Sequence, residues 1–374
     1  MATYPRFWSR VQAGAGYVLR SRGAVDMPAR GTPPVAVQYQ LAGLDARTFY
    51  EPSPGRSDLV FSAANALQFP TSPTSFVGPT TPGSLTRYPA SGDGDFTASA
   101  DGQVIEGLDI YGSVRLLAFV GVTIRNCRIR GTLATGSNTA FVVASNENLR
   151  GAVIEDCELV GRGNLWCEGI RGSNYTIRRC DLHGMTDGIS LTSQGGNVQV
   201  LGNWIHDCLY SEWDSTTPNM PTQGSYYMHC DAIQFHRGKD YVIRGNYLGG
   251  VRAADPSTGA VWGHHTGHLS DIQAADDFYN SCILLKQEVD STQANKIERV
   301  LIEQNVFNGG VASLNHPSGN GNDFSSTTIR DNQFVPFPYA GTSFYILKSP
   351  SLLTVMSGNT FTTGGAVPIS NGGG

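Results

Sequence analysis

A short pattern that recurs along the chain constrains the fold more than any other feature. From about residue 103, an apolar anchor is followed five positions later by a second apolar residue, and in all units after the first a Cys or Asn stands three positions after the anchor. Roughly twenty to thirty residues separate most anchors, which is the length of one turn of a solenoid. Two longer gaps indicate insertions. The anchors are Ile105, Ile124, Ile154, Ile177, Val200, Ile243, Ile302 and Ile329.

The repeats predict strands rather than helices. Within each unit β-branched residues alternate with polar ones over a few positions before a turn intervenes, which is a period of two. Stacked in parallel, such strands bury a continuous apolar column. The third position after the anchor is Cys in three successive coils and Asn in the next four, so we expect buried thiols to stack and amides to hydrogen-bond along the axis. These positions are Cys127, Cys157, Cys180, Asn203, Asn246, Asn305 and Asn332.

This pattern resembles the right-handed β-helix superfamily of pectate lyases, polygalacturonases and phage tailspikes. The resemblance covers about residues 100–365 and implies an all-β fold, a right-handed single-stranded parallel β-helix. The segment from Val355 to Phe361 fits the repeat with one extra residue, as a bulge in a last coil would. We assign residues 96–374 to the solenoid. Residues 1–95, which lack the repeat and are rich in Pro, Gly, Ser and Thr, form a small irregular cap or an attachment region with a linker.

Composition excludes several other classes. The 45 glycines and 19 prolines favour many turns and short strands over an α-rich enzyme. A net charge of -5 makes nucleic acid a poor partner. The first residues lack the apolar stretch of a signal peptide, and no run of the chain is fit to span a membrane. Seven cysteines without a C-x-x-C pair are expected to be reduced and buried. No cofactor and no metal are assigned.

Acidic residues recur on a second series of strands. Glu168, Asp187 and Asp231 each precede an isoleucine by two positions, in the segments Glu-Gly-Ile, Asp-Gly-Ile and Asp-Ala-Ile. If the isoleucines point into the column, we expect the three carboxylates to stack on one outer wall about 5 Å apart. Such a stack is costly unless a proton, a cation or a ligand relieves the repulsion. Catalysis, hydrogen bonding to a ligand and capping of the ladder are the three roles left open.

The residues around this acid row complete a candidate catalytic set. His236 and Lys286 occupy outward positions on the same wall, and His229 lies two residues before Asp231. The candidate catalytic residues are Asp187, Asp231, Glu168, His229, His236 and Lys286.

Two local segments resemble known families. The segment Met185-Thr-Asp187-Gly-Ile189 resembles the Asn-Thr-Asp-Gly segment of polygalacturonases, but Cys230 replaces the first residue of that family's Asp-Asp pair. The Gly-His-Gly and Arg-x-Lys segments of that family have no clear match. The segment His229-Cys-Asp231-Ala-Ile-Gln234 resembles a His-x-Asp-x-Ile-Gln segment of β-helix proteins from actinobacteria and their phages.

The two insertions carry aromatic and histidine side chains. Aromatic faces beside polar groups bind sugar rings, whose C–H faces are apolar. The alternative is that these aromatics pack the loops onto the column. A histidine group, His264, His265 and His268 with Asp271, has ligand types that suit zinc but an uninformative spacing. The candidate substrate-binding residues are Gln234, Tyr210, Trp213, Tyr226, Tyr227 and Trp262.

Three classes of function follow. The first is a phage tail protein, made in the host cytoplasm and released on the virion, that binds a host surface polysaccharide and in one version cleaves it as a hydrolase or lyase. The second is a soluble polysaccharide hydrolase or lyase, and the third is a structural fibre segment of the virion. Resemblance to tailspikes implies a homotrimer, with a surface glycan and other virion tail proteins as partners and with neither nucleic acid nor membrane.

Overall fold

The computed structural model describes the repeat region and little of the N-terminal part. The ranges are residues 38–40, 66–68, 78–132, 139–162, 167–192, 195–206, 208, 230–249, 281–286, 297–310, 312–317, 326–336 and 344–371. Within these ranges, no helix is both long and apolar enough to cross a membrane.

Three parallel sheets account for nearly all of the described strands. Sheet B comprises β3 (Thr86–Tyr88), β6 (Leu108–Ile110), β9 (Arg128–Ile129), β12 (Glu158–Val160), β15 (Asp181–His183), β18 (Trp204–His206), β21 (Tyr247–Gly249), β24 (Val306–Asn308), β27 (Gln333–Phe334) and β30 (Thr360–Phe361).

Sheet C comprises β4 (Phe96–Thr97), β7 (Val114–Arg115), β10 (Thr139–Ala144), β13 (Cys167–Gly172), β16 (Ile189–Leu191), β19 (Asp231–Phe235), β22 (Ser281–Leu285), β25 (Ala312–His316), β28 (Phe344–Lys348) and β31 (Ile369–Asn371).

Sheet D comprises β5 (Val104–Glu106), β8 (Thr123–Arg125), β11 (Ala152–Glu155), β14 (Tyr175–Arg178), β17 (Val198–Leu201), β20 (Gly238–Arg244), β23 (Ile297–Glu303), β26 (Thr327–Arg330) and β29 (Val355–Ser357). Outside these sheets lie the antiparallel pair β1 (Gln38–Gln40) and β2 (Ala66–Gln68), and the 3-10 turn η2 (Pro82–Ser84).

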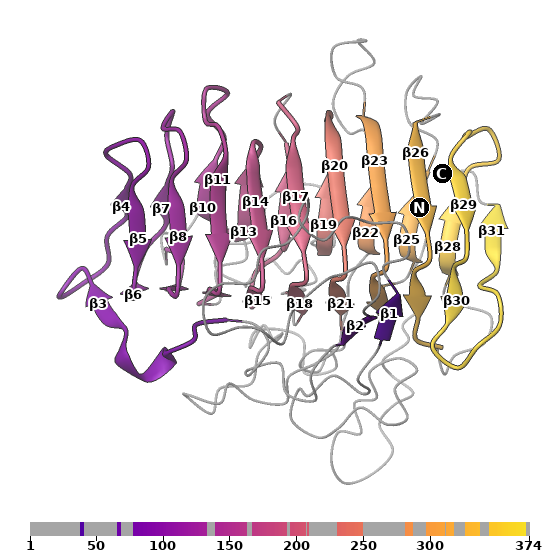
Figure 1. Ribbon diagram of the computed structural model, residues 1–374, viewed down its shortest axis with the longest axis horizontal. Coiled ribbons are helices and arrows are strands. Elements are labelled where there is room, and N and C mark those ends of the chain that lie inside the picture. The colour runs from indigo at the N-terminus through magenta and orange to yellow at the C-terminus, as the bar shows by residue number, and fades with distance from the viewer. Residues whose placement is uncertain are drawn as a thin grey trace, which may run out of the picture.

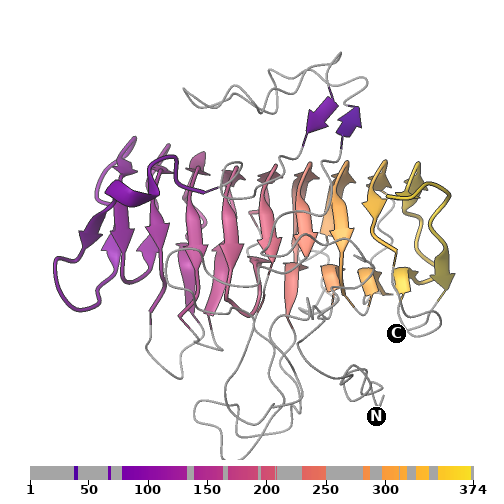
Figure 2. The same cartoon turned by 90° about the horizontal axis from the view of Figure 1, so that it is seen from below.

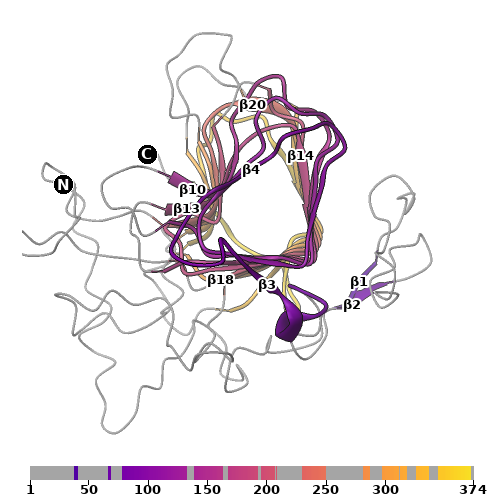
Figure 3. The same ribbon diagram turned by 90° about the vertical axis from the view of Figure 1, so that its left-hand side faces the viewer.

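The chain passes through the sheets in the order B, C, D and then repeats, so each coil contributes one strand to each sheet. Each strand pairs in parallel with the strand three elements later. The coils therefore stack along one long axis (Figure 1), and a view down that axis shows sheets B, C and D as three walls around a common interior (Figure 3). The predicted parallel β-helix is confirmed.

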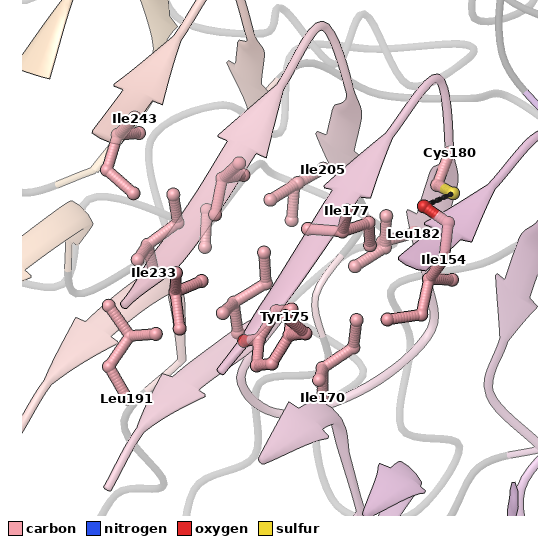
Figure 4. Packing of buried hydrophobic residues seen from close by; sticks show 14 of the residues in the cluster. Ile154, Ile170, Tyr175, Ile177, Cys180, Leu182, Leu191, Ile205, Ile233 and Ile243 are labelled. Atoms are coloured by element: carbon pink, nitrogen blue, oxygen red, sulfur yellow. Dashed lines mark hydrogen bonds between the residues drawn. The ribbon is translucent and has the colours of Figure 1, made fainter. Parts of the chain in front are cut away.

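The interior is the apolar column that the repeat predicts. The anchor residues of sheet D lie in register, with Ile154 opposite Ile177. They are fully buried with apolar residues of the other two sheets, such as Leu182 of sheet B and Ile170 of sheet C (Figure 4). Because each coil adds its own aliphatic side chains to this column, the hydrophobic stabilisation is spread along the whole solenoid.

The predicted ladder of thiols and amides lies at the corner between sheets D and B. Cys127, Cys157 and Cys180 are fully buried, and Figure 4 shows the Cys180 thiol against the Ile154 carbonyl. In the following coils each Asn side chain accepts a hydrogen bond from the preceding coil through its Oδ1 atom and donates one to the next coil through its Nδ2 atom. The Oδ1 atom of Asn305, for example, accepts from the backbone N–H of Asn246 at 3.0 Å and from its Nδ2 at 2.9 Å. The prediction is confirmed.

The last coil corrects one detail of the sequence analysis. Met356, not Val355, pairs with Ile329, and Asn359 joins the amide ladder by accepting from Asn332. The repeat therefore continues without an extra residue, because a methionine takes the place of the β-branched anchor. At the other end, strand β3 already pairs with β6, so the first coil begins before residue 95.

One row on the outer face of sheet D carries charges that alternate in sign from coil to coil, interrupted by Leu201 between Arg178 and Arg244. Arg125 pairs with Glu106 at 2.9 Å, and Arg178 pairs with Glu155 at 2.8 Å. Further along the sheet Glu303 contacts two arginines, Arg244 and Arg330. Since in-register stacking brings each charge beside the residue at the same position of the next coil, alternation turns repulsion into attraction.

The amide ladder makes the first testable prediction. Removing the Asn305 side chain by Asn305→Ala takes away the acceptor of Asn246 and the donor to the carbonyl of Ile243 in a fully buried place. The expected loss is about 2 to 4 kcal/mol of unfolding free energy, measured by urea denaturation. The exposed Asn148→Ala is the control and should change it by less than about 0.5 kcal/mol. Equal effects of the two changes would contradict a stabilising ladder.

His316 on β25 makes a second prediction. Its ring is fully buried, lies 3.2 Å from the Leu285 carbonyl and 2.7 Å from the Thr354 hydroxyl, and burial lowers its pKa from 6.5 to about 4. Between pH 6.5 and pH 4 the His316 side chain is therefore protonated in the unfolded chain but stays neutral in the folded chain. About 3 kcal/mol of stability should be lost as the pH falls from 6.5 to 4.

The measurement is the unfolding free energy of the wild type and of His316→Gln across that range. Glutamine keeps one donor and one acceptor but does not titrate, so its curve should be flatter by this amount. If the unfolding free energies of the two proteins changed in parallel with pH, His316 would not be the source of the pH dependence.

Candidate functional site

The candidate acid row lies at the start of consecutive strands of sheet C. The register pairs Ile170 with Ile189 and Ile189 with Ile233. By the same register, the residues two positions earlier, Glu168, Asp187 and Asp231, lie one above another on neighbouring coils. Adjacent parallel strands are about 4.8 Å apart, so the three carboxyl groups share one short stretch of the sheet.

A bend in the chain decides which way these side chains point. In a regular strand residues 187 and 189 would share a face. A Cβ on Gly188 would lie 2.5 Å from Cγ2 of Ile205, which is inside the column, and Ile189 is itself a core residue. Two successive positions therefore face the interior. This places Asp187 on the outer side, and a glycine is needed at 188 because the Ala232 carbonyl is equally close.

Glu168 forms a bidentate ion pair on this wall. Both of its oxygens accept from Arg171, each at 2.6 Å, and the two side chains are largely buried. Burial lowers the pKa of Arg171, but its hydrogen bonds to Glu168 and the charges of Glu168 and Asp187 outweigh this, so the pKa is raised overall. Arg171 thus places a cation beside the acid row, and the sequence analysis did not assign it.

Asp187 and Asp231 are connected by a hydrogen bond. The Oδ1 atom of Asp187 accepts from the backbone N–H of Asp231 at 2.9 Å. Asp187 is half-buried, whereas Asp231 is fully buried. The two carboxyl groups therefore lie in different environments on adjacent coils, and Asp187 is the more accessible of the pair.

A second outer row lies beside the acids. Ser190 pairs in register with Gln234, and the hydroxyl of Ser190 lies 3.3 Å from Nε2 of His236. Gln234 is 8% exposed, His236 is half-buried, and Lys286 is exposed at the end of β22. Together with Arg171 these groups offer donors and acceptors within a few strands, which is the chemistry that hydroxyl-rich ligands require.

The remaining predicted residues lie outside the described part of the chain. These are His229, Tyr210, Trp213, Tyr226, Tyr227 and Trp262, together with His264, His265, His268 and Asp271. Their roles stay predictions.

The structure also brings together a group that the sequence analysis missed. On the outer face of sheet B, Glu158, Asp181 and His183 place one ligand atom each within 4.8 Å of the others. In the next coil, His206 pairs in register with His183. The signal was present in the repeats, because Glu-Leu-Val, Asp-Leu-His and Trp-Ile-His stand at equivalent positions around a buried aliphatic residue.

A comparison with protein-family models agrees with this architecture. A family model described as a right handed beta helix region matches residues 106–259. The chain contains a right-handed β-helix region. No curated protein sequence matches it. Among solved structures, this β-helix is similar to the Dettilon tailspike protein (gp208), with 12% sequence identity and a TM-score of 0.33 over 72% of this chain. The match spans about half of the tailspike, 53% of its length.

The hydrogen bond between the two aspartates makes a third prediction. Asp187→Asn keeps an oxygen that accepts from the Asp231 N–H, so it should cost less than about 1 kcal/mol, whereas Asp187→Ala should cost about 1 to 3 kcal/mol. The measurement is again urea denaturation. If the asparagine variant were as unstable as the alanine variant, the charge of Asp187, and not its acceptor oxygen, would stabilise this part of sheet C.

Proposed function

We propose that this β-helix is a tail protein of a phage and that the outer wall of sheet C around Asp187 binds a host cell-surface polysaccharide. The binding site is proposed because carboxylates stand at one position on successive coils of sheet C, with Arg171 and the Ser190, Gln234 and His236 side chains beside them. A polysaccharide repeats its hydroxyl groups along one direction, as the wall repeats its donors and acceptors along the solenoid axis.

The acid row favours a ligand because it is poorly suited to a purely structural role. Like charges at the same position of neighbouring coils repel. On sheet D such positions alternate in sign, as Arg178 and Glu155 do. On sheet C the Glu168, Asp187 and Asp231 positions do not alternate, and Arg171 forms its bidentate pair with Glu168 at one end of the row. Positions that break a rule obeyed elsewhere in a fold are those at which function is expected.

Hydrolysis of the bound polysaccharide is the second candidate. The observation that favours it is the difference between the two adjacent aspartates, since Asp231 is fully buried and Asp187 is half-exposed. Glycoside hydrolysis requires one carboxyl group that holds its proton and one that is ionised, and different environments create this difference.

The proposal that this protein belongs to a phage tail is based on its sequence. The segment from His229 to Gln234 resembles β-helix proteins of actinobacteria and their phages, and its described part, Asp231 to Gln234, lies in strand β19 at the centre of the candidate wall. A rigid elongated solenoid suits this task, because it presents one long side wall to a surface polymer.

The fourth prediction tests binding and cleavage together. Purified wild type and Asp187→Asn are incubated with polysaccharides from actinobacterial cell envelopes and other bacterial surfaces. Retention on a glycan column should fall at least about tenfold in the variant, since a hydrogen bond to a charged group is lost. New reducing ends would indicate hydrolysis, and ultraviolet absorbance of unsaturated uronates would indicate elimination.

Asp240→Asn is the matched control. Asp240 is an aspartate of a different sheet, sheet D, where it pairs with Arg299 at 2.6 Å on the surface. This change should leave retention unaltered. If Asp187→Asn and Asp240→Asn behaved alike, or if none of the glycans were retained by the wild type, the proposed wall would not be a glycan site.

A further inference from the structure

The buried group on sheet B has the composition of a metal site. The Nε2 atom of His183 lies 3.1 Å from Oε1 of Glu158, and Asp181 completes a set whose ligand atoms all lie within 4.8 Å of one another. A zinc ion bound at about 2.0 to 2.1 Å would hold tetrahedral ligands about 3.3 Å apart. The first pair is already at that separation, and small rotations of Asp181 would bring in the third ligand.

Neighbouring side chains hold these three groups in place. Arg128 donates to the second oxygen of Glu158 at 2.5 Å, which leaves Oε1 directed to His183. His206 lies 2.7 Å from Oδ1 of Asp181. The His206 ring stacks on Trp204 with centroids 3.5 Å apart. Outer partners of this kind orient the ligands of protein metal sites and tune their affinity.

The group lies on the outer face of sheet B and yet is buried. Glu158 is 7% exposed, Asp181 3% and His183 0%. Part of the cover comes from the segment before η2, where the backbone N–H of Gly78 donates to the Arg179 carbonyl at 2.9 Å. Figures 2 and 3 show this segment running along the outside of sheet B.

Two carboxylates, those of Glu158 and Asp181, lie close together in a place largely shielded from water. A cation bound between them would be attracted by both charges, and the low dielectric of a buried place strengthens that attraction.

We propose that Glu158, Asp181 and His183 bind one divalent transition-metal ion, for which zinc is the reference. An imidazole beside two carboxylates suits zinc and related ions, whereas calcium and magnesium prefer oxygen ligands alone. The ion joins β12 to β15 beneath the segment around Gly78. Its role is therefore to fasten two neighbouring coils of the solenoid together. This site is on a different sheet from the proposed glycan wall and does not depend on it.

The experiment uses the full chain, stripped with a chelator and then titrated with zinc. We expect one zinc ion per chain to remain after desalting, measured by elemental mass spectrometry, and a rise in the thermal midpoint that grows with zinc concentration. X-ray absorption at the zinc edge should show only nitrogen and oxygen ligands near 2.0 to 2.1 Å. A sulfur shell near 2.3 Å would assign the ion to the buried cysteines and overturn the proposal.

Variants locate the ion independently of these spectra. His183→Gln and Glu158→Gln should each abolish retention of zinc, and His206→Gln should weaken it by about 10- to 100-fold, as expected for an outer partner. Asp231→Asn on sheet C is the control and should retain the ion. Far-ultraviolet circular dichroism checks that each variant folds. Two ligand variants are made so that the site can still be tested if one of them does not fold. Zinc retained by both folded variants, lost by Asp231→Asn, or absent from the wild type would refute the site.

Discussion

Each coil of this protein rests directly on the next in parallel register, and the rest of the structure depends on that stacking. Neighbouring strands are about 4.8 Å apart, so every side chain meets the residue at the same position in the coils on either side. A position is stable only if its occupants tolerate one another. Aliphatic residues do so in the column, and asparagines do so because one amide both donates and accepts.

Charged positions satisfy the same constraint in different ways on the three sheets. On sheet D opposite charges alternate, as in the Arg178–Glu155 pair. On sheet B the carboxylates of Glu158 and Asp181 are adjacent, and histidines of the following coils contact them. On sheet C, Glu168, Asp187 and Asp231 follow one another with Arg171 at one end. The departures from alternation mark the two places where we propose that something binds.

The two proposed sites differ in what the fold makes accessible. The wall of sheet C includes half-buried and exposed groups, among them Asp187 and Lys286. The group on sheet B is shielded by the segment around Gly78 and is small enough to suit an ion. A rigid solenoid allows both, because a change on one outer face is separated from the other faces by the apolar column.

The sequence by itself determined the repeat and therefore the architecture. Anchors such as Ile177, followed three positions later by Cys or Asn, specify the column, the corner ladder and the parallel register, because a solenoid is built from local units that meet only their neighbours. The alignment of Glu168, Asp187 and Asp231 follows from the same repeat. The last coil was misaligned by one residue because Met356 does not look like a β-branched anchor.

Only the tertiary structure decided which side chains meet across and around the coils. The bend at Gly188, the bidentate pairing of Arg171 with Glu168 and the burial of Asp231 depend on backbone geometry and packing that no residue spacing specifies. The burial of the group on sheet B could not be predicted from the repeat, because a segment that lacks the repeat folds over this group near Gly78. A sequence period predicts which residues stack, whereas packing from elsewhere in the chain determines which of them become buried, paired and chemically distinct.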